Sequence, residues 1–100
     1  MVHHLSSERV ESMARNGQAV IVDVRESGEY RSGHIPRSRH IPLGQLLHRL
    51  KEVNKAHTVV VVCQSGNRSA RACEMLQEAG YGKVFNLTGG MKSWKGPVER

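Results

Sequence analysis

Three short runs of mostly apolar residues constrain the fold of this chain more than any other feature. They cover residues 19–24, 58–62 and 83–87, and none of them alternates apolar and polar residues. Strands without this alternation are typical of parallel sheets, where both faces are buried. Helical patterns separate the runs, so the sequence predicts an α/β domain with a mainly parallel sheet and helices on both faces.

The segments between these runs carry helix and loop signals. A serine cap and a closing glycine bound a predicted helix over residues 6–17. Leucines at helical spacing predict an amphipathic helix over residues 43–53, and an apolar stripe predicts another over residues 69–79. A last short helix is expected to end at Trp94. Residues 25–42 are polar and contain glycines and prolines, so we expect mostly loop or short turns there.

Composition limits the chain to one small domain, and we expect residues 1–100 to form it. Apolar residues make up 38% of the chain, which is enough for a core.

The longest apolar run, residues 59–63, is too short to cross a bilayer, and the N-terminus shows no signal peptide. Two cysteines without a Cys-x-x-Cys pair, and histidines without metal-ligand spacing, predict no disulfide scaffold and no metal site. A reducing, cytoplasmic location is therefore expected.

Cys63 occupies the most informative position in the sequence. It ends a buried strand, a polar loop with Gly66 follows, and a helix then begins. Such a loop turns its backbone N–H groups inward, the helix N-terminus adds partial positive charge, and Arg68 adds a full one. These groups would hold Cys63 as the nucleophilic thiolate and could also cradle a tetrahedral anion. The alternative is that Cys63 is a small, unreactive hydrophobe in the core.

Residues 63–69, with the sequence CQSGNRS, resemble the active-site loop of the rhodanese domain, the thiosulfate sulfurtransferase family. Two further stretches support this resemblance. Residues 23–42 contain Asp-Val-Arg-Glu, Gly-His-Ile-Pro and Ile-Pro and look like the family's N-terminal signature, and residues 87–94 look like its C-terminal signature. Together the three motifs carry the resemblance over about residues 5–98.

The resemblance implies a five-stranded, mainly parallel sheet, with a short strand near residues 38–41 and another at the extreme N-terminus. It also implies a chemistry that needs no cofactor. Cys63 would attack the outer sulfur of thiosulfate, release sulfite and carry the sulfur as a persulfide, which cyanide or a thiol would then take. The loop would bind the anionic donor through its remaining residues: Gln64, Ser65, Gly66, Asn67, Arg68 and Ser69.

The resemblance assigns supporting roles to residues outside the loop. Asp23 is expected to help hold the active-site region, and Arg25 is expected to form a structural ion pair with Glu29. Trp94 is expected to pack across the sheet edge, near the pocket. We interpret Cys73 as a core residue on the helical stripe, with a role as resolving thiol as the alternative.

Other functions remain as alternatives. The protein could be a persulfide carrier or docking module that passes sulfur to a protein partner. The loop between Cys63 and Arg68 is one residue shorter than in the related cell-cycle phosphatases and arsenate reductases, which disfavours phosphoryl or arsenate chemistry. We expect the chain to act as a monomer.

The chain has a surplus of positive charge, with a formal net charge of +6. Such a surplus suggests an anionic partner, but aromatic residues make up only 4% of the chain and no nucleic-acid-binding motif is present. Six basic residues and one acid lie in residues 31–55, so five of the six surplus charges fall there. The surplus either gathers small sulfur anions or an acidic protein partner, or it is a solvated basic face.

Overall fold

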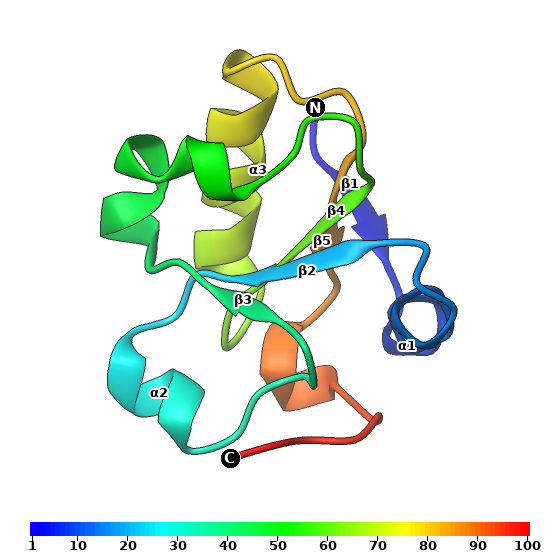
Figure 1. Ribbon diagram of the computed structural model, residues 1–100. Coiled ribbons are helices and arrows are strands. Elements are labelled where there is room, and N and C mark those ends of the chain that lie inside the picture. Colours follow the sequence, from blue (N-terminus) through cyan, green and yellow to red (C-terminus); the bar gives the residue numbers. More distant parts are fainter.

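A single five-stranded sheet forms the centre of the protein, and every pair of neighbouring strands runs parallel (Figure 1). The computed structural model describes all 100 residues. In chain order the strands are β1 (His3–Leu5), β2 (Val20–Asp23), β3 (Arg39–His40), β4 (Val59–Val62) and β5 (Val84–Leu87).

The strands lie in the sheet in the order β1-β5-β4-β2-β3, which places β4 at the centre. Asp23 at the end of β2 lies opposite Val62 of β4, and Val61 lies opposite Asn86 of β5. The carboxyl ends of these three strands therefore meet at one edge of the sheet, where α/β proteins usually place their reactive groups. The predicted fold is confirmed, including the short strands near residues 38–41 and at the N-terminus.

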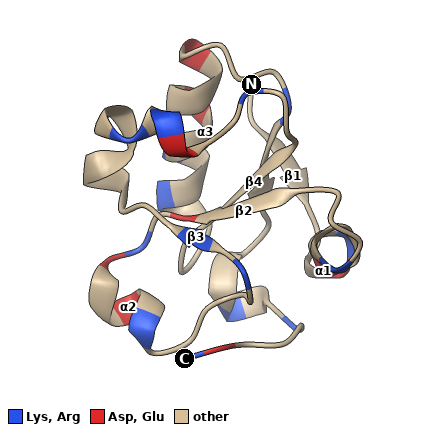
Figure 2. Cartoon of the chain, viewed as in Figure 1, with Lys and Arg blue, Asp and Glu red and all other residues tan.

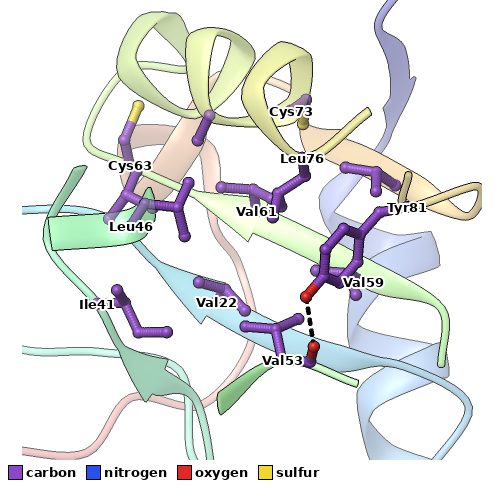
Figure 3. Close-up of a cluster of buried hydrophobic side chains, with 13 residues drawn as sticks. Val22, Ile41, Leu46, Val53, Val59, Val61, Cys63, Cys73, Leu76 and Tyr81 are labelled. Atoms are coloured by element: carbon purple, nitrogen blue, oxygen red, sulfur yellow. Dashed lines mark hydrogen bonds between the residues drawn. The ribbon is translucent and has the colours of Figure 1, made fainter. Parts of the chain in front are cut away.

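Helices cover both faces of the sheet, as the sequence pattern predicted. The helix α3 (Asn67–Glu78) and the 3-10 turns η1 (Leu43–His48) and η2 (Leu50–Glu52) lie on one side, and α1 (Ser7–Arg15) lies on the other (Figure 1). Successive residues of β4 point to opposite faces, so Val61 joins the core under α3 and Val60 joins the core under α1. Figure 3 shows the first of these clusters, in which the Tyr81 hydroxyl donates a hydrogen bond to the backbone oxygen of Val53.

Local signals account for the helix that precedes β2. The side chain of Ser6 accepts a hydrogen bond from the backbone N–H of Arg9 at 3.2 Å, which caps α1 as predicted. Gly17 follows the end of α1 with a φ of 68°, a conformation that favours glycine. None of the helices in the structure is both long and apolar enough to span a membrane.

The predicted amphipathic helix over residues 43–53 is wrong, because the two 3-10 turns η1 and η2 occupy this segment. Arg49 separates them with a φ of −123°, which is outside the helical region. The apolar residues explain the difference. Leu43 and Leu46 are three residues apart, as are Leu50 and Val53, which is the 3-10 repeat, whereas Leu47 is 57% exposed.

The segment 25–42 is less irregular than the sequence suggested, because it contains the short helix α2 (Ser27–Arg31). The backbone N–H of Glu26 donates a hydrogen bond to the Glu29 carboxylate at 3.0 Å. This bond stabilises the first turn of the helix. Further along, Arg37 has a φ of 66° and is the one residue other than glycine with a positive φ. A positive φ is uncommon for a residue that carries a side chain.

Candidate active site

Cys63 directly follows β4, and solvent reaches none of it. The chain then turns through Gly66, whose φ of 101° is accessible to glycine at little cost, and α3 begins at the next residue. This turn aims backbone N–H groups at the sulfur, and that of Gly66 donates to the Cys63 Sγ at 3.0 Å. The Ser69 hydroxyl approaches the same sulfur from the first turn of α3, at 3.3 Å.

The surroundings of Cys63 favour its thiolate. Burial alone would raise the pKa of this thiol, because it removes water from the charged form. Hydrogen bonds from the Ser69 hydroxyl and from the backbone N–H groups of Ser69, Gly66 and Ser65 outweigh burial, so the pKa of Cys63 lies below its usual value. The helix dipole of α3 acts in the same direction. The loop thus favours the nucleophilic thiolate form of Cys63.

Asn86 belongs to the site although the sequence reasoning missed it. It lies on β5, is 3% exposed, and its side-chain oxygen shares the single Ser69 hydroxyl proton with the Cys63 sulfur. Its side-chain nitrogen donates to the Gly66 backbone oxygen at 3.2 Å and lies 3.2 Å from Nδ1 of His4. A polar residue inside an otherwise apolar strand was the available signal, since a buried amide needs partners.

The segment after β5 supports the loop from outside through the 3-10 turn η3 (Gly90–Ser93). The backbone N–H of Met91 donates to the Cys63 oxygen at 2.8 Å, and that of Lys92 donates to the Gln64 oxygen at 3.1 Å. These bonds require the two backbones to approach closely. A Cβ on Gly90 would collide with the Cys63 oxygen and would lie 2.6 Å from the Gln64 carbonyl carbon.

Asp23 and Arg25 form a buried ion pair at the end of β2. The Nε and Nη2 atoms of Arg25 donate to the Asp23 carboxylate at 2.9–3.1 Å, and so does the Arg25 backbone N–H at 3.0 Å. The same guanidinium donates to the Gly33 backbone oxygen at 2.7 Å and to the Gln64 side-chain oxygen at 3.2 Å. Both residues therefore connect the chain after β2 to the loop.

The predicted ion pair between Arg25 and Glu29 is wrong. Arg25 is bound to Asp23, and both Nη atoms of Arg68 bind the Glu29 carboxylate, each at 2.8 Å. Hydrogen bonding to Arg68 lowers the pKa of Glu29 to about 2, with burial acting against it. Arg68 thus reaches across from α3 to α2 and is held there by an ionised carboxylate.

The remaining predicted residues differ in where they lie relative to the Cys63 loop. Ser65 and Asn67 are exposed in the loop, whereas Trp94 packs with the second core cluster, on the α1 side of the sheet. Its indole N–H donates to the Pro97 oxygen at 3.0 Å, and it helps line a hollow of about 230 Å³ that contains no loop residue. Trp94 therefore lines a hollow that is separate from the Cys63 loop. Cys73 lies on the buried face of α3, and burial raises the pKa of its thiol to about 12.

The central strand, the cysteine loop and the helix that follows define a class of protein, the α/β domains that present a stabilised thiolate at the carboxyl edge of a parallel sheet. The family model described as Rhodanese-like domain matches residues 6–97. This chain belongs to that family. A solved structure of a rhodanese-like domain protein from Staphylococcus aureus has a TM-score of 0.90 and 29% identity, and the match covers 98% of this chain and 97% of that one.

Curated relatives carry names that refer to sulfur. A putative sulfur carrier protein, YrkF of Bacillus subtilis, is 42% identical over 79% of this chain, and the match spans only 43% of that protein. A sulfurtransferase of Allochromatium vinosum is 37% identical over 94% of this chain and 89% of its own length. The thiosulfate sulfurtransferase GlpE of Stutzerimonas stutzeri is 35% identical over 81% of this chain and 74% of its own length.

Replacing Ser69 by alanine should raise the pKa of Cys63, because one of the donors that stabilise the thiolate is lost. The reaction of Cys63 with an electrophile such as iodoacetamide should then rise with pH over a higher range than in the wild type. At neutral pH its rate should fall by about three- to tenfold, because a typical hydrogen bond contributes about 0.5–1.5 kcal/mol.

The matched control for this measurement is Ser65→Ala, since the Ser65 side chain is exposed and makes no hydrogen bond while its backbone N–H remains. This variant should shift the pH profile far less. Equal shifts in the two variants would contradict a specific role for the Ser69 hydroxyl.

Proposed function

We propose that this protein is a sulfurtransferase that carries sulfur as a persulfide on Cys63. The observation that carries the proposal is the set of donors around the Cys63 sulfur, from Gly66 at 3.0 Å and Ser69 at 3.3 Å, which lower the pKa of a completely buried thiol. A buried cysteine without a chemical role needs no such set. The same donors stabilise the thiolate before sulfur transfer and the persulfide anion after it.

The reaction proceeds in two displacement steps. In the first, the thiolate attacks the outer sulfur of a donor such as thiosulfate. A sulfur–sulfur bond forms at Cys63, the bond inside the donor breaks, and sulfite leaves with the electron pair of the broken bond. In the second, a thiol or cyanide attacks the outer sulfur of the persulfide, and the Cys63 thiolate is restored. No cofactor takes part in either step.

The names of the relatives support both candidate functions. A sulfurtransferase and a thiosulfate sulfurtransferase match most of this chain and most of their own length. The relative named a sulfur carrier supports the second candidate, in which the persulfide passes to a protein acceptor rather than to a small molecule. In either case Cys63, the loop residues 64–69 and the pair Asp23–Arg25 form the proposed site, in a monomer.

Mass measurement of the intact protein after exposure to thiosulfate tests the proposal. The wild type should gain one sulfur atom, and Cys63→Ser should gain none. Cys73→Ala is the matched control, because it removes the other thiol, which burial keeps protonated. This variant should load like the wild type. A wild type that stays unloaded with thiosulfate and with other sulfane donors would refute the assignment.

Turnover separates the two candidates. A sulfurtransferase acting on small molecules should form thiocyanate from thiosulfate and cyanide over many cycles. A carrier should load fully but release sulfur slowly to cyanide. The measurement is the ratio of the loading rate to the thiocyanate production rate, with free dithiothreitol as a second acceptor.

A further inference from the structure

The hollow beside Trp94, of about 230 Å³, lies on the α1 side of the sheet, and no residue of the cysteine loop lines it. Its apolar lining comes from three separate segments: α1, residues 35–36 after α2, and the chain after η3, which contributes Trp94 and Pro97. Pockets for drug-sized ligands usually measure about 300–1,000 Å³. This hollow therefore fits a smaller molecule, such as a single ring with a short side chain.

Trp94 gives the hollow a fixed aromatic surface. Its indole N–H donates to the Pro97 oxygen at 3.0 Å, so the polar end of the ring already has a partner. Gly96 lies against the ring, since a Cβ at that position would come within 2.5 Å of the indole Cζ2 atom. Trp94 is nevertheless only half-buried. A ring that is already held in place loses little conformational freedom when a ligand packs against it.

The charged residues at the hollow leave one positive charge without a partner. Glu11 and Arg15 of α1 neutralise each other through an ion pair of 3.2 Å. Arg37 also lines the hollow, is exposed, and makes no ion pair and no side-chain hydrogen bond within the protein. A carboxylate suits such a group, because the two N–H donors of a guanidinium match its two oxygens.

The net charge of the protein does not by itself mark this place. Basic residues are spread over the whole chain rather than gathered on one face (Figure 2). What distinguishes the hollow is the combination of an apolar ring surface and a guanidinium without a partner, which complements a ligand that is apolar at one end and negatively charged at the other.

The backbone of Arg37 is held in a conformation that costs free energy. The backbone N–H of Ser38 donates to the Ile35 oxygen at 3.1 Å, which closes a turn with Pro36 and Arg37 as its central residues. A proline followed by a φ of 66° is the pattern of a type II turn, whose second central residue is usually glycine. Residues kept in such a conformation are concentrated at ligand sites, where the surrounding structure has to support the strain.

We infer that this hollow binds a small carboxylate with a flat apolar body, of the arylacetate class, at a second site separate from the proposed sulfur-transfer site. The ring of the ligand packs against Trp94, and its carboxylate binds the guanidinium of Arg37. The strained turn holds that guanidinium at the rim of the hollow. The inference does not depend on the chemistry of Cys63, because the cysteine loop contributes nothing to the hollow.

Phenylacetate is the probe for this site, and the wild-type protein carries its own reporter. Trp94 is the only tryptophan in the chain, so indole fluorescence reports directly on the hollow. Titration with phenylacetate should change this fluorescence with a Kd of about 0.1–1 mM, as expected for a ligand of about ten non-hydrogen atoms. Calorimetry should give the same Kd without using the fluorophore.

Two analogues separate the contributions of the ring and the charge. Phenylacetamide has the shape of phenylacetate without its charge, and acetate has the charge without the ring. Each should bind at least about threefold more weakly than phenylacetate, because each lacks one of the two contacts. Phenylacetamide binding as tightly as phenylacetate would refute the role of the guanidinium, and acetate binding as tightly would refute the role of Trp94.

The variant Arg37→Gln removes the guanidinium from the rim. Phenylacetate binding should weaken by about three- to tenfold, the usual effect of one hydrogen bond, and phenylacetamide binding should not change. Arg31→Gln is the matched control, because Arg31 on α2 is also exposed but does not line the hollow. This control should bind phenylacetate like the wild type. Unchanged binding in Arg37→Gln would place the ligand elsewhere and would refute the site.

The variant Arg37→Gly gives a second, independent measurement. It should bind phenylacetate as weakly as Arg37→Gln, yet it should unfold at a temperature about 4–8 °C higher, because glycine adopts a positive φ without strain. Weaker binding together with higher stability would show that Arg37 serves the ligand and not the fold. An Arg37→Gly protein that binds normally and is no more stable would refute the inference. Sulfur loading of Cys63 tests the proposed function separately, so the failure of one does not decide the other.

Discussion

Replacing Asp23 by asparagine should lower the free energy of unfolding by about 3–5 kcal/mol, because it leaves the Arg25 guanidinium charged and unpaired in the interior. The Arg25 side chain is 3% exposed and that of Asp23 1% exposed, so water cannot take over the role of the carboxylate. A small domain has about 5–15 kcal/mol of stability in total, so the expected loss is a large part of it. Urea unfolding followed by circular dichroism measures the change.

Two further variants identify the cause of that loss. Glu11→Gln removes a carboxylate from an exposed ion pair with Arg15 and should cost less than about 1 kcal/mol. The double variant Asp23→Asn, Arg25→Met removes the buried charge together with its partner and should recover part of the lost stability. If the double variant were less stable than Asp23→Asn alone, the unpaired charge would not be the reason for the loss.

Much of the fold could be predicted because its signals are local or periodic. The three buried strands needed only their mostly apolar, non-alternating character, and the cap at Ser6 needed only one side chain and the helix after it. Cys63 and its loop were found because a nucleophile, a glycine and a helix start stand next to each other in the sequence. Patterns of this kind involve residues that are close in the sequence, so they can be recognised before the fold is known.

The errors concern choices between partners, which the sequence does not contain. Arg25 has several acidic residues close in the chain and pairs with Asp23, two residues before it, whereas Glu29 on α2 pairs with Arg68, 39 residues away. The leucines of residues 43–53 fit two helix types, and only packing against the core decided between them. Asn86 became visible as a site residue only when β5 lay beside β4. Apart from the local Asp23–Arg25 pair, these features depend on contacts between distant segments.

Replacing Gly90 by alanine should disturb the loop more than any substitution that keeps the loop's own sequence. Gly90 has a φ of 62°, which costs residues with a Cβ about 1–2 kcal/mol. The added Cβ would also press on the backbone of Cys63 and Gln64, which cannot move without breaking the hydrogen bonds from Met91 and Lys92. We expect a total loss of about 2–5 kcal/mol in urea unfolding, since overpacking adds about 1–3 kcal/mol to the backbone strain.

The same substitution should also impair the chemistry, because displacement of the Cys63 backbone moves the sulfur relative to its donors from Gly66 and Ser69. Sulfur loading per folded molecule should therefore fall at a temperature well below the unfolding transition, and the pKa of Cys63 should rise. Gly82→Ala is the matched control, since a Cβ there meets no atom within 4 Å, and its loading should equal that of the wild type. A Gly90→Ala protein that is less stable but loads normally would show that η3 supports the fold without positioning the thiolate.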